Sequence, residues 1–217
     1  MREREPLSRE RVLVVAVGLA DADGIAKLTM RRLAAELGVE AMSLYYHLPG
    51  KTGLLDGLLE TVLAEVVAAT RAVPLAGDWR VTLRGWFLAA REVMLRHPWA
   101  PGLLGPGRAI PPSVFAYYEL ILASLIEAGF SYRIAHRALH AFGSMPLGFV
   151  QETFGPAADG DLDEQQLAAM AETMPHVAAM VAAELHDAAD PTLGWCDSGV
   201  EFAFTLDLLF DSLERYR

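Results

Sequence analysis

The segment from Thr29 to Lys51 concentrates side chains whose types suit contacts with a nucleic acid. Thr29 stands where a helix is expected to begin, so its hydroxyl and the free backbone N–H groups of the first turn can bind a phosphate. Arg31 is long enough to reach a phosphate or a base edge, and Lys51 can bind one more phosphate. These residues suggest recognition of double-stranded DNA.

A second set of candidate contacts lies between residues 41 and 47. Ala41 and Met42 can contact thymine methyl groups, and Ser43 can hydrogen-bond to a base edge. A helix cannot bury three consecutive side chains equally, so at least one or two of the residues Tyr45 to His47 are expected to face outward. Outward-facing side chains at these positions can contact phosphates.

The elements that would hold these residues have the proportions of a helix-turn-helix unit. One short helix is predicted to begin at Thr29 and to close at Gly38, because glycine suits the left-handed conformation that ends a helix. A second spans residues 40–47 and ends before the turn pair at 49–50. In such a unit the second helix enters the major groove by its N-terminal end. A plain helix pair with an ordinary surface is the alternative. The shared core is expected to consist of Leu33, Leu37, Val39 and Leu44.

Apolar residues recur with the period of a helix along nearly the whole chain, and no stretch alternates as a strand would. A first helix is expected to begin after Ser8, its N-cap, and to end at the turn formers of residues 21–24. We therefore predict an all-α fold of about nine or ten helices. Beyond the helix-turn-helix unit, the predicted helices span residues 51–73, 78–97, 113–128, 131–154, 162–185 (interrupted at Pro175) and 195–216.

The chain has 217 residues and a formal net charge of −10, but this charge is unevenly distributed. Residues 1–52 hold eight basic and seven acidic residues, a net charge of +1, whereas residues 53–217 hold 10 basic and 21 acidic residues, a net charge of −11. We therefore predict two domains: a three-helix DNA-binding head at residues 1–52 and a larger helical body at residues 53–217.

The cellular compartment follows from cysteine use and hydropathy. The chain has one cysteine, Cys196, which excludes an intramolecular disulfide. Charged residues interrupt every apolar run before it could span a membrane, and no signal segment is recognisable. The sequence predicts a cytoplasmic protein with no membrane partner.

Residues 28–55 resemble the TetR family of one-component repressors. The resemblance is carried by the sequence LTMRRLAAELGVEAMSLYYHLPGKTGLL and continues more weakly through residues 129–131 and 143–152. It implies that the body binds a small-molecule effector and dimerises through a four-helix bundle. The tetracycline repressor has a glutamine where this chain has Ala41, so a bidentate adenine reader is missing and the operator is expected to differ. Together with Thr29, the DNA contacts implied by the resemblance are Met30, Arg31, Ala41, Met42, Ser43, Tyr45, Tyr46, His47 and Lys51.

The candidate effector contacts lie on the central helices of the body. Their aromatic and methionine side chains suit an apolar cavity, with His97, His140 or Glu152 as orienting polar groups. Ordinary bundle core is the alternative for any one of them. The predicted contacts are Trp86, His97, Leu104, Phe115, Tyr118, Leu122, His140, Met145, Phe149 and Glu152.

The effector implied by the resemblance is not a metal–tetracycline complex. Val67, Trp86 and Leu104 stand where tetracycline-binding members place a polar residue, the drug-contacting asparagine and the metal-binding histidine. Of the positions around the metal, only Glu152 keeps a carboxylate. We expect a different, largely apolar effector.

The last predicted helix has apolar residues on more than one face, which a helix packed on one side only would not need. We expect it to form a dimer bundle with the helix near 131–154; a helix buried within its own monomer is the alternative. A homodimeric repressor of this kind would bind half-sites of palindromic operator DNA about one DNA turn apart or slightly more, and an effector would release it. The two faces carry Phe202, Leu206, Leu209 and Leu213, and Phe204 and Leu208.

Enzymatic and metal chemistry have weaker support in the sequence. No paired catalytic motif is present, so we expect no enzyme; an all-α enzyme or ligand-binding module using the central cavity, with His97 or His140 as acid or base, is the alternative. His136 and His140 lie one helical turn apart and could share a metal, but no third ligand is evident nearby. No cofactor or metal is therefore expected, and whether this pair binds a metal stays open.

Overall fold

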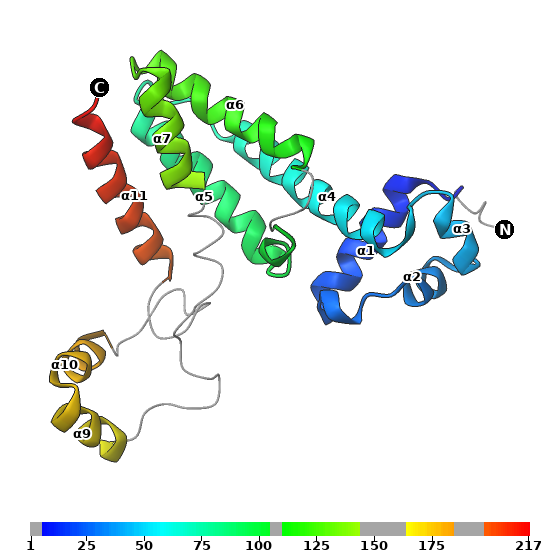
Figure 1. Cartoon of the computed structure of the whole chain (residues 1–217), viewed down its shortest axis with the longest axis horizontal. Coiled ribbons are helices and arrows are strands. Elements are labelled where there is room, and N and C mark those ends of the chain that lie inside the picture. The colour runs from blue at the N-terminus through cyan, green and yellow to red at the C-terminus, as the bar shows by residue number, and fades with distance from the viewer. Residues whose placement is uncertain (1–5, 105–109, 144–163, 185–197) are drawn as a thin grey trace. The chain divides into compact units, whose positions relative to one another are not determined.

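The computed structural model of the chain describes residues 6–104, 110–143, 164–184 and 198–217. Within these ranges it contains ten α-helices and no strand, which confirms the all-α prediction (Figure 1). The chain forms two compact units, Met1–Leu147 and Gly148–Arg217. None of the helices in the described ranges is long and apolar enough to cross a membrane.

The first three helices gather at the N-terminal end of the first unit (Figure 1). Both predicted N-caps are confirmed. Ser8 Oγ accepts a hydrogen bond from the Arg11 backbone N–H at 3.1 Å, and Thr29 Oγ1 accepts one from the Arg32 N–H at 3.2 Å. Each cap satisfies a backbone donor that a helix leaves unpaired at its start. The three helices are α1 (Arg9–Asp23), α2 (Met30–Leu37) and α3 (Ala41–Tyr45), with a 3₁₀ turn at Ile25–Lys27.

Gly38 closes α2 as the sequence predicts. Its φ of 66° is left-handed, where glycine avoids the steric penalty of a β carbon. The Gly38 N–H donates to the carbonyl of Ala35 at 3.2 Å, and the Val39 N–H donates to the carbonyl of Ala34 at 3.0 Å. These two bonds satisfy two of the carbonyls in the last turn of α2 and turn the chain sharply toward α3.

The long helix α4 (Gly50–Ala72) leads away from the head and packs against α1, α5 (Trp79–Arg96) and α6 (Pro112–Glu127) (Figure 1). The Glu60 carboxylate on α4 accepts hydrogen bonds from the Ser113 hydroxyl at 2.8 Å and the Ser113 backbone N–H at 3.3 Å. It therefore caps the first turn of α6. The predicted domain boundary after residue 52 falls within the first turn of α4 and stays a prediction.

Aromatic pairs join α5 to α7 and to the turn that precedes α7. Phe87 on α5 and Phe142 on α7 (Tyr132–Gly143) have ring centroids 5.2 Å apart. Trp79 meets Phe130 edge-to-face at 5.1 Å. Such separations are typical of favourable aromatic pairs, so α5 and α7 share one core. Ser131 Oγ accepts a hydrogen bond from the Ile134 N–H at 3.4 Å and so caps the start of α7.

The contact between α1 and α4 depends on Gly57. A β carbon added at this position would lie 2.7 Å and 3.2 Å from the two methyl carbons of Leu13, and 3.3 Å from a guanidinium nitrogen of Arg9. The first of these distances is shorter than a normal van der Waals contact. Gly57 therefore lets α1 approach α4 closely.

Replacing Gly57 by valine is expected to destabilise the protein by about 1–3 kcal/mol, because Leu13 and the α1 backbone must move to admit the new side chain. Urea unfolding measures this loss. Gly18→Ala is the matched control: Gly18 is exposed in α1, with nothing within 4 Å of an added β carbon. That change should stabilise α1 by up to about 1 kcal/mol. Equal stability of the two variants would contradict the close approach.

The second unit contains α9 (Glu164–Thr173), α10 (Pro175–Glu184) and α11 (Ser198–Glu214). The predicted interruption at Pro175 is confirmed, because α9 ends at Thr173 and α10 begins with the proline. On α11 a row of apolar side chains is buried, whereas Phe204 and Leu208 remain 57% and 54% exposed. Residues 144–154 and 195–197 of the predicted dimer helices lie outside the described residues. The buried row is Phe202, Leu206, Phe210 and Leu213.

Candidate nucleic-acid interface and effector region

A small apolar core fixes α2 against α3. Leu33 and Leu37 of α2 and Leu44 of α3 are buried, as predicted, and Val39 in the turn is half-buried. Leu44 is the only buried residue of the five-residue helix α3, so this single side chain anchors α3 to the head. An ion pair between Arg32 on α2 and Asp23 at the end of α1 further joins the first two helices.

The predicted DNA contacts on and after α3 include the two most exposed large hydrophobic side chains among the described residues of the head. Met42 is 70% exposed, Tyr45 48% and Tyr46 89%. The expectation that at least one or two residues of the Tyr-Tyr-His run face outward is confirmed. Ala41, Ser43 and His47 are half-buried. Large exposed aromatic side chains next to a buried anchor form a surface suited to a partner.

The predicted phosphate contacts on α2 and α4 are also at the surface. Arg31 and Lys51 are exposed, and Met30 is half-buried. Thr29 Oγ1 accepts a backbone hydrogen bond as the N-cap, which leaves the hydroxyl hydrogen to donate to a phosphate. The structure thus brings the polar contacts predicted from sequence to the solvent-facing side of α2, α3 and the start of α4, while their role in DNA binding stays a prediction.

The predicted effector contacts differ in how deeply their side chains are buried. Trp86 is buried on α5, and its indole Nε1 has no hydrogen-bond partner among the described residues. Tyr118 and Leu122 on α6 are half-buried, as is Leu104, whereas Phe115 is exposed. Their role in ligand binding stays a prediction. Met145, Phe149 and Glu152 lie outside the described residues.

Sequence reasoning missed Tyr117 on α6. Its hydroxyl is buried and has no hydrogen-bond partner among the described residues. Burial, with a further contribution from Tyr118, raises the pKa of the Tyr117 phenol well above its ordinary value of 10, so the hydroxyl keeps its proton. Tyr117 precedes the buried Ile121 and Leu125 by one and two helical turns, but Tyr118 has the same spacing to Leu122, so the sequence did not single out Tyr117. Trp86 and Tyr117 thus supply two unused donors on α5 and α6, which pack together.

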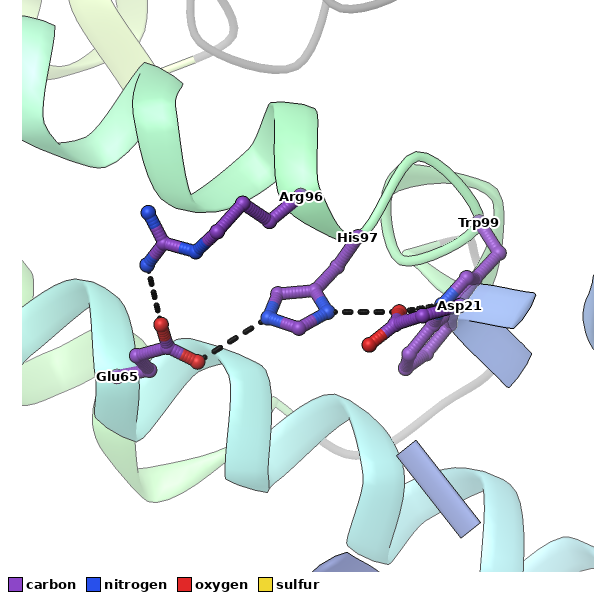
Figure 2. A network of polar contacts seen from close by, with 5 residues as sticks. All are labelled: Asp21, Glu65, Arg96, His97 and Trp99. Carbon is purple, nitrogen blue, oxygen red and sulfur yellow. Dashed lines mark hydrogen bonds and ion pairs between the residues drawn. The ribbon is translucent and has the colours of Figure 1, made fainter. Parts of the chain in front are cut away.

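His97, at the end of α5, lies between two carboxylates from different helices (Figure 2). Its side chain is only 8% exposed. The ring Nδ1 lies 2.8 Å from Asp21 Oδ1 on α1, and Nε2 lies 3.1 Å from Glu65 Oε2 on α4. The Trp99 indole donates to the same Asp21 oxygen at 2.7 Å, and Arg96 pairs with the other oxygen of Glu65. Both ring nitrogens of His97 are therefore engaged within the chain, and its predicted effector contact is untested.

The position of Glu65 beside Arg96 and His97 lowers the pKa of its carboxyl group. Partial burial alone would raise the pKa of its carboxyl group, but hydrogen bonds and charges from Arg96 and His97 outweigh it. The net effect holds the pKa of Glu65 below its ordinary value of 4.5. Glu65 is therefore ionised at neutral pH and acts as an acceptor for both neighbours.

His136 and His140 meet on the exposed surface of α7. Their Nε2 atoms lie 3.2 Å apart and the rings are edge-to-face. Among the described residues, no group of three or more His, Cys, Asp or Glu side chains could hold a metal ion. The pair is thus explained by one hydrogen bond between a protonated and an unprotonated ring nitrogen.

Comparisons with known proteins cover both parts of the chain. Residues 12–58 match the family model for bacterial regulatory proteins of the tetR family, and residues 73–216 match the model for the tetracyclin repressor-like C-terminal domain. The tetracycline repressor protein class C of Escherichia coli is 34% identical over 78% of this chain and 77% of its own length. An HTH-type transcriptional regulator of Saccharopolyspora erythraea is 35% identical over 59% of this chain, which spans about half (53%) of that regulator's length.

A solved structure extends the likeness over the whole fold. The crystal structure of a possible TetR family transcriptional regulator from Streptomyces coelicolor A3(2) superposes with a TM-score of 0.77 at 30% identity. The superposition covers 97% of this chain and all of that chain.

Proposed function

Because this chain belongs to the TetR family of bacterial regulatory proteins, we propose that it is a homodimeric transcriptional repressor, released from palindromic operator DNA by a small, largely apolar effector. Members of the family bind DNA and ligands. The observation that carries the proposal is the exposed surface of Met42, Tyr45 and Tyr46 around the buried anchor Leu44. Such a surface gives α3 side chains for base edges and phosphates, while α2 and Lys51 add phosphate contacts.

Dimerisation is supported by α11. Val200, Phe204 and Leu208 recur at one-turn intervals and are all more than half exposed in the single chain. A continuous apolar row of this kind is typical of a surface that another chain covers. We propose that two copies pack through the helices near residues 131–154 and 195–216. The dimer would present two heads to two half-sites.

The effector class follows from the side chains of the body. Val67 and Trp86 are buried and apolar in character, and Leu104 is half-buried, which supports a ligand held mainly by apolar contacts. The unused donors of Trp86 and Tyr117 suit a ligand that carries hydrogen-bond acceptors. We propose no catalytic activity and a cytoplasmic location, since the protein must reach DNA.

The test is a salt titration of binding to the DNA that flanks the protein's own gene. For the wild-type protein, the logarithm of the Kd should rise linearly with the logarithm of the salt concentration. Lys51→Ala should lower that slope by about 1 for each head, and so by about 2 for a dimer. Arg71→Ala is the matched control, because it removes the same charge from an exposed position at the far end of α4 and should leave the slope unchanged. Absence of salt-dependent binding, or equal slopes for the two variants, would contradict the proposal.

A further inference from the structure

The arrangement around His97 fixes the number of protons on its ring. An ionised carboxylate can only accept hydrogen bonds, and a neutral imidazole has one donor and one acceptor nitrogen. Both ring nitrogens face carboxylate oxygens, at 2.8 Å and 3.1 Å (Figure 2). Only the imidazolium form can donate to Asp21 and Glu65 together. A neutral ring would place one nitrogen lone pair against a carboxylate oxygen.

The other groups around the ring do not remove this requirement. The Trp99 indole lies edge-to-face with the His97 ring at 6.0 Å and donates to Asp21, so it leaves that carboxylate an acceptor. Arg96 is a cation that pairs with Glu65 and keeps it ionised. The charged groups of this network are therefore two carboxylates and one guanidinium, and an imidazolium balances them.

These contacts span three helices. Asp21 belongs to α1 in the head, Glu65 to α4, and His97 follows the last residue of α5. The His97 side chain is almost completely buried, whereas the side chains of Asp21 and Glu65 are 30% and 42% exposed, so water still screens these contacts in part. The ring thus joins the first helix of the head directly to two helices of the body.

We infer that His97 is a positioning residue which, as an imidazolium, ties α1 to α4 and α5 and makes operator binding depend on pH. The inference rests on the proposed function for its effect on DNA. A head held in place has less freedom to lose when two half-sites are bound, so the tie favours binding. The tie holds while the ring carries both protons, and it is lost when a rise in pH removes one of them.

At low pH the contact between Glu65 and His97 is lost because the Glu65 carboxylate becomes protonated. A carboxyl group whose pKa is depressed contributes stability above its ordinary pKa, and this stability is lost as the pH falls through the lower value in the folded protein. For Glu65 the ordinary value is 4.5. The tie therefore needs an ionised Glu65 together with a doubly protonated His97 ring.

The variant Glu65→Gln distinguishes a pH-dependent contact of the His97 imidazolium from a purely structural role of His97. The two oxygens of Glu65 contact different partners, Arg96 and His97. A glutamine can keep its carbonyl oxygen toward Arg96 and turn its amide N–H toward His97, which then accepts at Nε2 and donates from Nδ1 to Asp21. The variant keeps the tie with a neutral ring, so it should no longer respond to pH in the histidine range.

The first arm of the experiment needs no DNA. Nitrogen-15 NMR of histidine-labelled protein, with His97→Phe to assign the ring, should find both His97 nitrogens protonated at about pH 6 in wild type. In Glu65→Gln only Nδ1 should be protonated. The urea midpoint of wild type should fall between about pH 6 and pH 8.5 by more than that of Glu65→Gln. A neutral His97 ring in wild type at the lower pH, or identical pH profiles, would overturn the inference.

The second arm measures operator affinity at the same two pH values. Wild type should bind about fivefold more weakly at the higher pH, a typical size for coupling between sites. Glu65→Gln should change by less than about twofold, although both proteins keep His47 in the head. Equal pH responses would overturn the inference. If neither protein binds DNA at either pH, the proposed function fails, while the NMR and unfolding results still decide whether the tie exists.

Discussion

Replacing Tyr45 and Tyr46 together by alanine is expected to weaken operator binding by roughly a thousandfold while leaving the fold intact. Each tyrosine that contacts a phosphate loses one hydrogen bond, worth about 1 kcal/mol, so four contacts in a dimer amount to about 4 kcal/mol. The two side chains are 48% and 89% exposed, and their removal opens no cavity. The free energy of unfolding should therefore change by less than about 0.5 kcal/mol. Fluorescence anisotropy with labelled operator measures the loss.

Two control variants distinguish the loss of a DNA contact from a loss of the folded structure. Tyr46→Phe removes only the hydroxyl and should lose part of the affinity. Leu75→Ala removes a 79% exposed apolar side chain between α4 and α5, outside the head and the proposed dimer helices, and should bind operator as wild type does. Operator binding by the double variant at wild-type strength would show that the exposed surface around α3 is not the DNA-binding surface.

Replacing Leu44 by alanine is expected to abolish operator binding by a different route. Leu44 is fully buried, and its truncation should reduce the free energy of unfolding by about 2–5 kcal/mol. A five-residue helix has almost no stability of its own, so α3 depends on this anchor. Without it, Tyr45 and Tyr46 remain in the chain but are no longer held in one orientation. Hydrogen exchange should show faster opening of residues 29–48.

The matched variant is Leu44→Met, which nearly conserves volume and should cost less than about 1.5 kcal/mol. It should retain operator binding. If Leu44→Ala binds operator normally and its head amides exchange as slowly as in wild type, α3 is held by other contacts and the account of the head is wrong.

The head could be predicted from the sequence because local signals determine it. Ser8, Thr29 and Gly38 each act on backbone groups within a few residues, so their roles as caps follow from residue type and position. The buried set of Leu33, Leu37 and Leu44 follows from helical spacing. Family resemblance then added which exposed positions are expected to contact DNA, which spacing alone does not specify.

The buried face of α6 could not be predicted in the same way. Apolar residues surround this helix on every side, so periodicity does not distinguish one face from another. The helical spacing favours a row through Phe115, Tyr118, Leu122 and Leu125. The structure buries Leu125 as expected, but it exposes Phe115, leaves Tyr118 and Leu122 half-buried, and buries Ile121 and the Tyr117 hydroxyl instead. Packing against neighbouring helices determines that the hydroxyl of Tyr117, and not that of the adjacent Tyr118, is the buried one without a partner.

The tie around His97 was beyond sequence reasoning for a different reason. Asp21 is 76 positions from His97 along the chain, and Glu65 is 32 positions away. No spacing rule connects such residues, because their meeting depends on how α1, α4 and α5 pack. From the sequence alone, His97 suggested a polar contact for an effector.

The most direct test of the central claim is selection of binding sites from random double-stranded DNA by the purified full-length protein. The account predicts that one sequence is enriched, that it is a palindrome with half-sites about one DNA turn apart or slightly more, and that light scattering finds a dimer bound to it. The same selection with Tyr45 and Tyr46 replaced by alanine should enrich nothing. Enrichment of no sequence by the wild-type protein, or of a single half-site bound by a monomer, would contradict the account.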